Sequence, residues 1–257
     1  SFVGSNGSCV FVVIKKEKGI VMKWGLVTYS KQFAWQKEIE QVGAALGNDS
    51  GLVVNNCFGE AGLGEIQGHN EQFEFGGYLT LCERMEGDGP FVFMNDTMFR
   101  THDTKGWLDL LLKIPKLDAE RLVVYGDIRK DGSELIERPD PFLASWIFVL
   151  PNRATLEVLQ SGLKAILAED VSPLSAEYEA FLQRWLNPNR ITGGWHGKKG
   201  DDELKRKRQC VIWEHRLSKW LLDAGVELRS MGEWNSRKYQ WLRIKDRLKT
   251  RWKAWMG

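Results

Sequence analysis

The alternation of strand-like and helix-like segments constrains the fold of this chain more than any other feature. Short runs rich in β-branched and aromatic residues lie at 25–29, 51–55, 91–94, 122–125 and 145–150. Longer runs with helical hydrophobic spacing lie at 34–46, 75–86, 107–112, 153–168 and 176–185. Strands that are separated by helices of this length form βαβ units. The sequence therefore predicts an α/β fold with a mainly parallel central sheet flanked by helices.

Composition excludes several other classes of protein. Hydrophobic residues make up 43% of the 257 residues, which is enough to form a sizeable core. The apolar runs, such as residues 9–14 and 122–125, are much shorter than the roughly 18 residues that a membrane-spanning helix needs. The four cysteines are scattered, without the spacing of a disulfide framework or a zinc site. We therefore expect a cytoplasmic protein whose membrane contact, if any, is peripheral.

The C-terminal part of the chain differs from the rest in net charge and in tryptophan content. Residues 186–257 carry 18 Lys and Arg against 8 Asp and Glu, a net charge of +10, and 7 of the 12 tryptophans. The remaining residues have a net charge of −8. An Asn-Pro-Asn break at 187–189, followed by a Gly-Gly pair, marks a boundary. We therefore predict a catalytic domain over residues 23–186 and a basic, Trp-rich helical tail over 187–257.

The N-terminal segment, residues 1–22, belongs neither to the predicted catalytic domain nor to the predicted tail. It lacks the charged start, apolar centre and cleavage site of a secretory signal. Residues 1–8 have a linker-like composition, and Met22 is a candidate start of the native chain. We assign residues 1–21 no function.

Polar residues follow the predicted strand at 91–94. In an open parallel sheet, ligands bind at the carboxyl ends of the strands, which here lead into loops at 30–33, 55–70, 95–102 and 126–141. The third loop opens with Asn95-Asp96-Thr97. A carboxylate in that place can bind a hard divalent cation that bridges phosphates. The alternative is that Asn or Asp caps the next helix.

Two glycine-rich segments precede that strand. Asn55 and Asn56 open the loop Asn-Asn-Cys-Phe-Gly-Glu-Ala-Gly-Leu-Gly-Glu, whose glycines let the backbone approach a ligand while the amides bond a base or a ribose. An ordinary loop is the alternative. Gly76 and Gly77 lie near the start of a predicted helix and weaken it by roughly 1 kcal/mol each relative to Ala. Either a ligand close to the backbone or tight packing of the helix on the sheet explains them.

The order of these segments is similar to that of a known family. A strand ending in Val-Asn-Asn, a Gly-rich loop, an Asn-x-x-Phe-Glu-Phe-Gly-Gly helix start and a strand ending in Asn-Asp-Thr together resemble GT-A glycosyltransferases. The resemblance is greatest to bacterial enzymes that assemble O-antigen, capsule and rhamnan-type polysaccharides. It covers about residues 25–170 and, more weakly, 212–218. It implies a GT-A-like fold and a nucleotide-sugar donor.

The resemblance also implies roles for particular residues. The residues that it places at the nucleotide are Tyr29, Asn55, Asn56, Asn70 and Gly76. It places Asp96, with Asn95 beside it, at the donor diphosphate and at a divalent cation, Mn²⁺ or Mg²⁺. The family's Asp-x-Asp motif has two carboxylates where this chain has one. A metal-free enzyme that neutralises the diphosphate with Arg100 or Arg129 is therefore the alternative.

Acidic residues before the segment 141–150, which resembles the family's acceptor-side strand, are candidate catalytic groups. An inverting transferase needs a carboxylate that deprotonates the acceptor hydroxyl. The candidates are Asp127, Glu137 and Asp140. His102 is a further candidate, with a packing role as its alternative. A retaining mechanism stays open.

The last predicted helix, residues 236–255, is basic and amphipathic. Its apolar residues at helical spacing are Trp241, Ile244, Leu248, Trp252 and Trp255. Eight lysines and arginines lie among them, a pattern typical of a helix at an anionic membrane surface. The alternatives are packing of the stripe on the catalytic domain, an acidic protein partner and nucleic acid. Nucleic acid is the least favoured, since no recognised nucleic-acid motif accompanies the charge.

These observations predict a glycosyltransferase of cell-surface polysaccharide biosynthesis. It would move a sugar from a nucleotide-sugar donor to a glycan acceptor, which we expect to be lipid-linked. The expected location is peripheral, at the inner face of the cell membrane. The competing hypothesis is a non-catalytic basic protein that recognises nucleic acid or an anionic partner through its tail.

Overall fold

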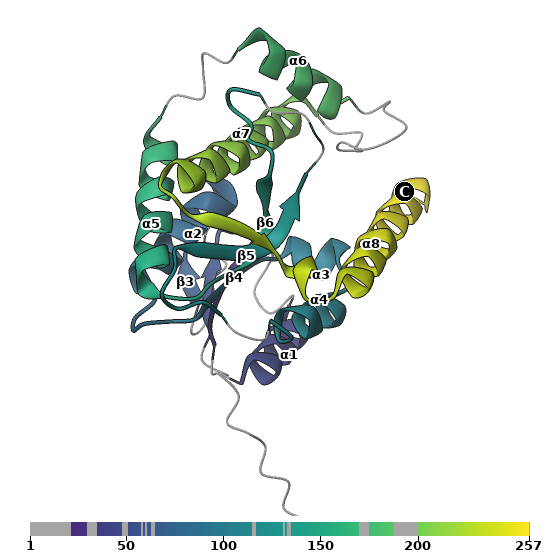
Figure 1. Ribbon diagram of the computed structural model, residues 1–257. Helices are drawn as coiled ribbons and strands as arrows, with labels where there is room; N and C mark the ends of the chain where they lie inside the picture. Colours follow the sequence, from purple (N-terminus) through teal and green to yellow (C-terminus); the bar gives the residue numbers. More distant parts are fainter. Residues whose placement is uncertain are drawn as a thin grey trace, which may run out of the picture.

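The computed structural model describes a central sheet with helices on both faces (Figure 1). The described residues are 22–29, 35–47, 51–57, 59, 61–62, 65–114, 117–130, 132, 135–169, 175–187 and 200–256, without the side chains of 250–256. The strands are β1 (Lys23–Thr28), β2 (Leu52–Asn55), β3 (Glu65–Gln67), β4 (Phe91–Asn95), β5 (Val123–Arg129), β6 (Phe142–Leu150) and β7 (Glu227–Ser230). The helices are α1 (Gln36–Leu46), α2 (Phe73–Arg84), α3 (Thr97–Thr101), α4 (Thr104–Leu111), α5 (Arg153–Ala168), α6 (Ala176–Trp185), α7 (Asp201–Asp223) and α8 (Ser236–Met256), with a 3₁₀ turn η1 (Met231–Glu233).

The sheet is mixed, with seven strands in the order β3-β2-β1-β4-β6-β5-β7. The pairs β2–β3, β1–β2, β1–β4 and β5–β7 are parallel, whereas β6 is antiparallel to both β4 and β5. A parallel return from β5 to β6 would require a crossover, usually a helix, and no helix of the described residues lies between these strands. The predicted α/β class with flanking helices is confirmed, and the sheet is parallel except at β6.

Each face of the sheet has its own hydrophobic core, because successive side chains of a strand point to opposite faces. In β4, Val92 and Met94 belong to the core that also contains side chains of α1, α4 and α8. Phe91 and Phe93 belong to the other core, which α2, α5 and α7 cover. All five residues of β4 are buried, as expected for a central strand covered on both faces.

The predicted tail does not form a separate unit, because its first half completes the sheet and one core. β7 pairs with β5 as the last strand, and α7 buries Trp213 and Leu217 in the second core. Glu214 accepts hydrogen bonds from the backbone N–H and the hydroxyl of Ser145 in β6, at 2.7 and 2.9 Å. The boundary that the sequence predicted at residue 187 therefore does not separate two cores. The Gly-Gly pair after it lies outside the described residues.

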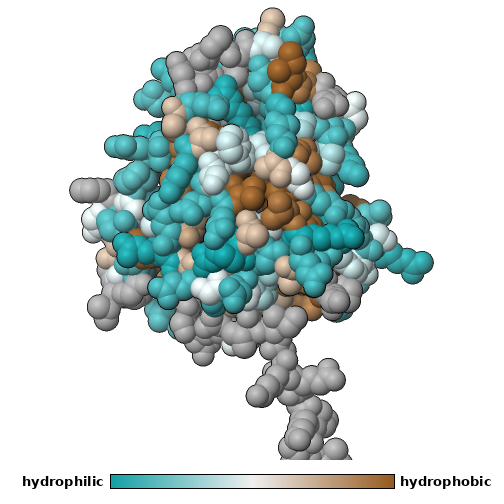
Figure 2. Space-filling view, turned by 60° about the vertical axis from the view of Figure 1, so that its left-hand side comes forward, coloured by the Kyte–Doolittle hydropathy of each residue, from teal (hydrophilic) through white to brown (hydrophobic). Residues whose placement is uncertain are grey.

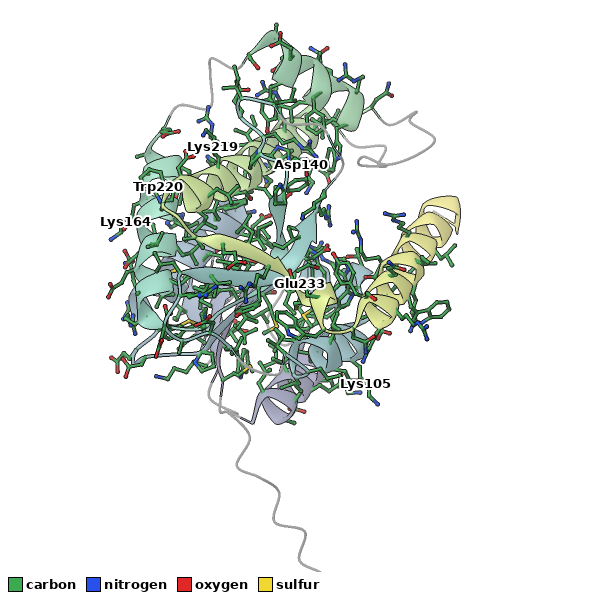
Figure 3. The ribbon with its side chains drawn as sticks, in the orientation of Figure 1. Lys105, Asp140, Lys164, Lys219, Trp220 and Glu233 are labelled. Carbon is green, nitrogen blue, oxygen red and sulfur yellow. The ribbon has the colours of Figure 1, made fainter. Side chains whose placement is uncertain are left out.

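The surface is mostly hydrophilic, and Figure 2 shows hydrophobic side chains gathered in a few patches on one face. Large exposed hydrophobic side chains of the described residues are Leu112, Ile136, Trp220, Trp241, Ile244 and Leu248. Trp220 extends from α7 toward α5, where Gly162 leaves room for its ring (Figure 3). The last three lie on α8. Within the described part of the chain, no helix is both long and apolar enough to cross a membrane.

Candidate functional site

The carboxyl ends of β1 and β4 mark a topological switch point in the sheet. From β1 the chain continues to β2 and β3 on one side and then returns to β4 on the other side of β1. Loops that leave two neighbouring strands in opposite directions open a crevice, which is where open α/β sheets bind ligands. Tyr29 follows β1 and Asp96 follows β4, and the backbone N–H of Asp96 donates to the carbonyl of Val27 at 3.0 Å. Two residues that the sequence assigned to the donor site therefore meet at the switch point.

Asp96 is a buried carboxylate, with 2% of its surface exposed. Its Oδ2 accepts from the backbone N–H of Tyr29 at 3.2 Å, and its Oδ1 accepts from Nη2 of Arg100 at 2.7 Å. Burial raises the pKa of Asp96, and the positive charge of Arg100 partly offsets that effect. The Arg100 side chain is 51% exposed, so its guanidinium lies at the surface beside the buried carboxylate. The site thus combines a buried carboxylate with a surface guanidinium.

Helix capping, the alternative explanation for Asn95-Asp96, applies to Asn95 alone. Oδ1 of Asn95 accepts from the backbone N–H of Thr97 at 3.0 Å, which turns the chain into α3. Asp96 occupies the N-cap position of α3, but its side chain makes no capping hydrogen bond. Capping therefore explains why Asn95 is polar, whereas the buried carboxylate of Asp96 is held by the N–H of Tyr29 and by Arg100 and takes no part in the helix start.

A metal ion at Asp96 would need ligands beyond the described residues. Among the described residues, no three His, Cys, Asp or Glu side chains are grouped in a way that could hold a metal ion. Mg²⁺ is often held by one or two carboxylates together with substrate phosphates and water, rather than by a cage of protein ligands. The lone carboxylate of Asp96 fits that second arrangement.

Asn55 and Asn56 lie at the end of β2, next to the end of β1. Asn55 ends β2 in register with Thr28 of β1, and its Nδ2 donates to Glu65 at 3.1 Å. Nδ2 of Asn56 donates to the carbonyl of Phe73 at 2.8 Å, which fixes the start of α2 beside the end of β2. Oδ1 of Asn56 is buried and has no hydrogen-bond partner among the described residues. The two amides therefore hold β3 and α2 in place at the same edge of the sheet as Asp96.

Sequence reasoning missed a half-buried acidic group at the start of α2. The hydroxyl of Tyr29 donates to Oε2 of Glu74 at 3.4 Å, and the thiol of Cys210 lies 3.6 Å from the same oxygen. Burial raises the pKa of Glu74, an effect that the charge of Lys207 partly offsets. A signal for this group was present in the sequence, because a Glu between two phenylalanines at a helix start is poorly placed for a solvated side chain. No local pattern pointed to Cys210, which reaches the group from α7.

Gly76 and Gly77, both in α2, have different surroundings. A Cβ on Gly77 would lie 2.5 Å from Cγ1 of Val27 in β1, so this glycine allows α2 to pack closely on the sheet. A Cβ on Gly76 would approach only the side chain of Gln72, at 3.0 Å. Packing therefore explains Gly77, whereas Gly76 remains a candidate for contact with a ligand. Asn70 lies exposed in the turn before α2.

Gly77→Ala is expected to lower the free energy of unfolding by about 1–3 kcal/mol, because Val27 is buried, β-branched and unable to move aside. Gly76→Ala is the matched control. It should leave stability unchanged or raise it by up to about 1 kcal/mol, because alanine favours the helix more than glycine does. Urea unfolding of both variants measures the difference, and equal losses would contradict this explanation of the pair.

The three acidic residues predicted as catalytic groups make different hydrogen bonds in the structure. Asp127 in β5 is 3% exposed and accepts from Tyr239 at 2.7 Å and from Nε1 of Trp146 at 3.2 Å. Glu137 accepts from the N–H and the hydroxyl of Ser175, the N-cap of α6, at 2.6 and 2.9 Å. Asp140 accepts from the backbone N–H of Gly132 at 2.7 Å and lies toward the α6 end of the molecule (Figure 3). Glu137 and Asp140 therefore organise a loop and a helix start.

Asp127 is held as an anion. Its burial opposes ionisation, but the charges of Arg129 and Arg243 and the hydrogen bonds from Tyr239 and Trp146 outweigh that effect and lower the pKa of Asp127. Arg129 contacts Oδ2 through Nε and Nη2, both at 3.3 Å. A carboxylate with a lowered pKa and this many donors is a weak base, so its geometry suits positioning better than proton abstraction.

His102 packs on an aromatic ring and pairs with a carboxylate. Its ring stacks on Trp146 with 3.7 Å between centroids, and its Nδ1 lies 2.7 Å from Oδ2 of Asp246 in α8. The same carboxylate accepts from Nε1 of Trp107 at 2.8 Å and from the N–H of Asp103 at 3.0 Å. His102 therefore has the packing role that the sequence left as an alternative, and a carboxylate from the C-terminal helix orients its ring.

Comparison of the chain with protein-family models, with curated proteins and with solved structures finds no match. The geometry of the switch point and the sequence motifs around it are therefore the features that indicate a function.

Proposed function

We propose that the chain is a GT-A-like glycosyltransferase that moves a sugar from a nucleotide-sugar donor to a glycan acceptor in cell-surface polysaccharide biosynthesis. One observation carries the proposal: the buried carboxylate of Asp96 lies at the switch point of the sheet and has no capping role. Burying a carboxylate costs free energy, which Arg100 and the N–H of Tyr29 offset in part, and a ligand that needs the charge would account for the remainder.

The residues around Asp96 suit the parts of a nucleotide sugar. Tyr29, Asn55 and Asn56 lie together at the ends of β1 and β2, where a base and ribose would lie. Arg100, which already contacts Asp96, would neutralise the diphosphate as it leaves. A bound Mg²⁺ or Mn²⁺ would supply the same neutralisation, and Asp96 is the residue that would hold it.

Nucleotides of the kinds that sugar donors release are expected to raise the melting temperature of the full chain. A ligand at 100 times its Kd stabilises the native state by about 2.7 kcal/mol, which corresponds to a shift of several degrees in a protein of this size. The measurement is a thermal-shift series with UDP, GDP, dTDP and CMP, each with and without Mn²⁺. A shift that needs Mn²⁺ would assign the diphosphate to a metal, and an equal shift without it would assign the diphosphate to Arg100.

Two further ligands show which part of the nucleotide the protein recognises. Inorganic diphosphate and the free nucleoside separate recognition of the phosphates from recognition of the base. Stabilisation by single-stranded oligonucleotides of any sequence, without stabilisation by any of the four nucleotides, would contradict the proposal and favour the non-catalytic basic protein.

A further inference from the structure

Helix α8 has two faces with opposite environments. On its inward face Tyr239, Leu242 and Asp246 are 8%, 2% and 7% exposed, and they contact the first core, Asp127 and His102. On its outward face Trp241, Ile244 and Leu248 are 61%, 48% and 58% exposed. Steps of three and four residues place these three side chains in one row along the helix, which we call the outward row. The packing of α8 on the domain therefore leaves the outward row uncovered.

The charges of α8 are arranged around the same row. Residues 236–256 contain eight Lys and Arg and one acidic residue, Asp246. Asp246 is turned inward, to His102 and Trp107. Arg237 and Arg247 are exposed, and at 100° per residue they fall within or beside the outward row, whereas Lys245 is paired with Asp103 at 2.7 Å. The outward face over residues 236–249 therefore combines large apolar side chains with positive charge and no negative charge.

From this arrangement we propose that the outward face of α8 docks on an anionic lipid surface, with the outward row at the boundary of headgroups and acyl chains and the basic side chains on lipid phosphates. A helix with an apolar row and basic flanks lies in the plane of such an interface. Figure 1 shows α8 at the edge of the molecule beside α3, with its C-terminal end directed away from the sheet, so the row is accessible to a flat surface. The proposal does not depend on the reaction that the domain catalyses.

Charge decides between lipid and the other possible partners. A second copy of α8 would place its basic face against an identical basic face, which is unfavourable. Nucleic acid would satisfy the arginines and lysines but would leave Ile244 and Leu248 in water, since phosphate contacts carry most of its non-specific affinity. An anionic lipid surface satisfies the apolar row and the positive charges together.

Docking of α8 on a membrane would also determine which part of the domain faces the lipid surface. The inward face of α8 contacts Asp127 at the end of the sheet and His102 after α3, the helix that begins beside Asp96. A lipid-bound α8 would therefore hold the loops that follow β4 and β5 near the membrane surface. A lipid-linked acceptor is presented at such a surface, and this last step rests on the proposed function.

The test is co-sedimentation of the full chain with vesicles of phosphatidylcholine alone and of phosphatidylcholine mixed with phosphatidylglycerol. We expect binding to the anionic vesicles that weakens as salt is raised. Combining Arg237→Gln and Arg247→Gln should reduce the partition coefficient about 25-fold, because each charge near an anionic surface contributes about fivefold. Combining Trp241→Ser, Ile244→Ser and Leu248→Ser should reduce it by more than about tenfold and remove the salt-resistant part.

Substitutions are preferred to removal of α8, because its inward face belongs to the core. All five substituted side chains are exposed, so the melting temperatures should match that of the unsubstituted protein. The control combines Leu112→Ser and Ile136→Ser, which remove exposed apolar side chains elsewhere and should leave vesicle binding unchanged. The thermal shift with nucleotides should be the same in every variant, which keeps this test separate from that of the proposed function.

Three results would overturn the proposal. One is equal binding to neutral and anionic vesicles by all variants. Another is binding of oligonucleotides, but not of vesicles, that the arginine variant loses. The third is a dimer in solution that the apolar variant dissociates, which would assign the outward row to a second copy of the chain.

Discussion

Asp96→Asn is expected to lower the rate of sugar transfer by about 100-fold or more while the fold stays intact. The amide oxygen can still accept from the N–H of Tyr29, which lies 3.2 Å from the carboxylate in the native protein. The negative charge that would hold a metal ion and orient Arg100 is lost, and removal of one positioned electrostatic group typically costs about 10²–10³ in rate. The readout is release of nucleoside diphosphate from the donor that the thermal-shift series identifies.

Stability separates a functional role of Asp96 from a structural one. Burial raises the pKa of Asp96, so its charge is held at a cost that asparagine does not incur. The variant should therefore unfold within about 1 kcal/mol of the unsubstituted protein. Asp202→Asn makes the same chemical change at a side chain that is 95% exposed, and it should change neither rate nor stability. Normal turnover by Asp96→Asn would refute the assignment of the diphosphate to this residue.

Elements with strong local patterns were predictable from the sequence. The strand at β4 and the helices at α5 and α6 lie where hydrophobic runs and helical spacing placed them. β3 and β7 were missed because three and four half-buried residues do not produce a distinct alternation. The direction of β6 was missed because it depends on the absence of a crossover helix after β5 rather than on the strand itself.

The candidate site was predictable where its residues follow strands. Tyr29, Asn55 and Asp96 lie at the carboxyl ends of β1, β2 and β4, and the rule for parallel sheets brings such positions together without knowledge of the contacts. Contacts made by the C-terminal helices could not be predicted in this way. Cys210 and Asp246 reach Glu74 and His102 across 136 and 144 positions of sequence, and no spacing rule relates residues so far apart.

Asp127→Ala is expected to lower the free energy of unfolding by about 2–5 kcal/mol. The Asp127 carboxylate accepts from the buried hydroxyl of Tyr239 and the buried indole of Trp146. Its removal leaves the indole without this partner and leaves the hydroxyl only its longer contact with the carbonyl of Ile128, at 3.3 Å, and each buried donor that loses its partner costs about 1–3 kcal/mol. Arg129, whose side chain is 37% exposed, can turn to water and adds little to the loss. Denaturant unfolding at neutral pH measures the change. Asp223→Ala is the control, because it breaks only a surface pair with Lys219 and should cost less than about 1 kcal/mol.

The pH dependence of stability distinguishes a structural anion from a catalytic base at Asp127. Its pKa is lower in the folded protein than the value of about 3.9 in the unfolded chain. The stabilisation from its charge is therefore complete well above pH 4 and declines as the pH falls through the folded pKa. Asp127→Asn should lose stability at neutral pH and show a smaller further loss between about pH 5 and pH 3 than the unsubstituted protein. If the variant instead keeps its stability and loses only sugar transfer, Asp127 acts on the acceptor and its contacts with Tyr239 and Trp146 do not hold the fold.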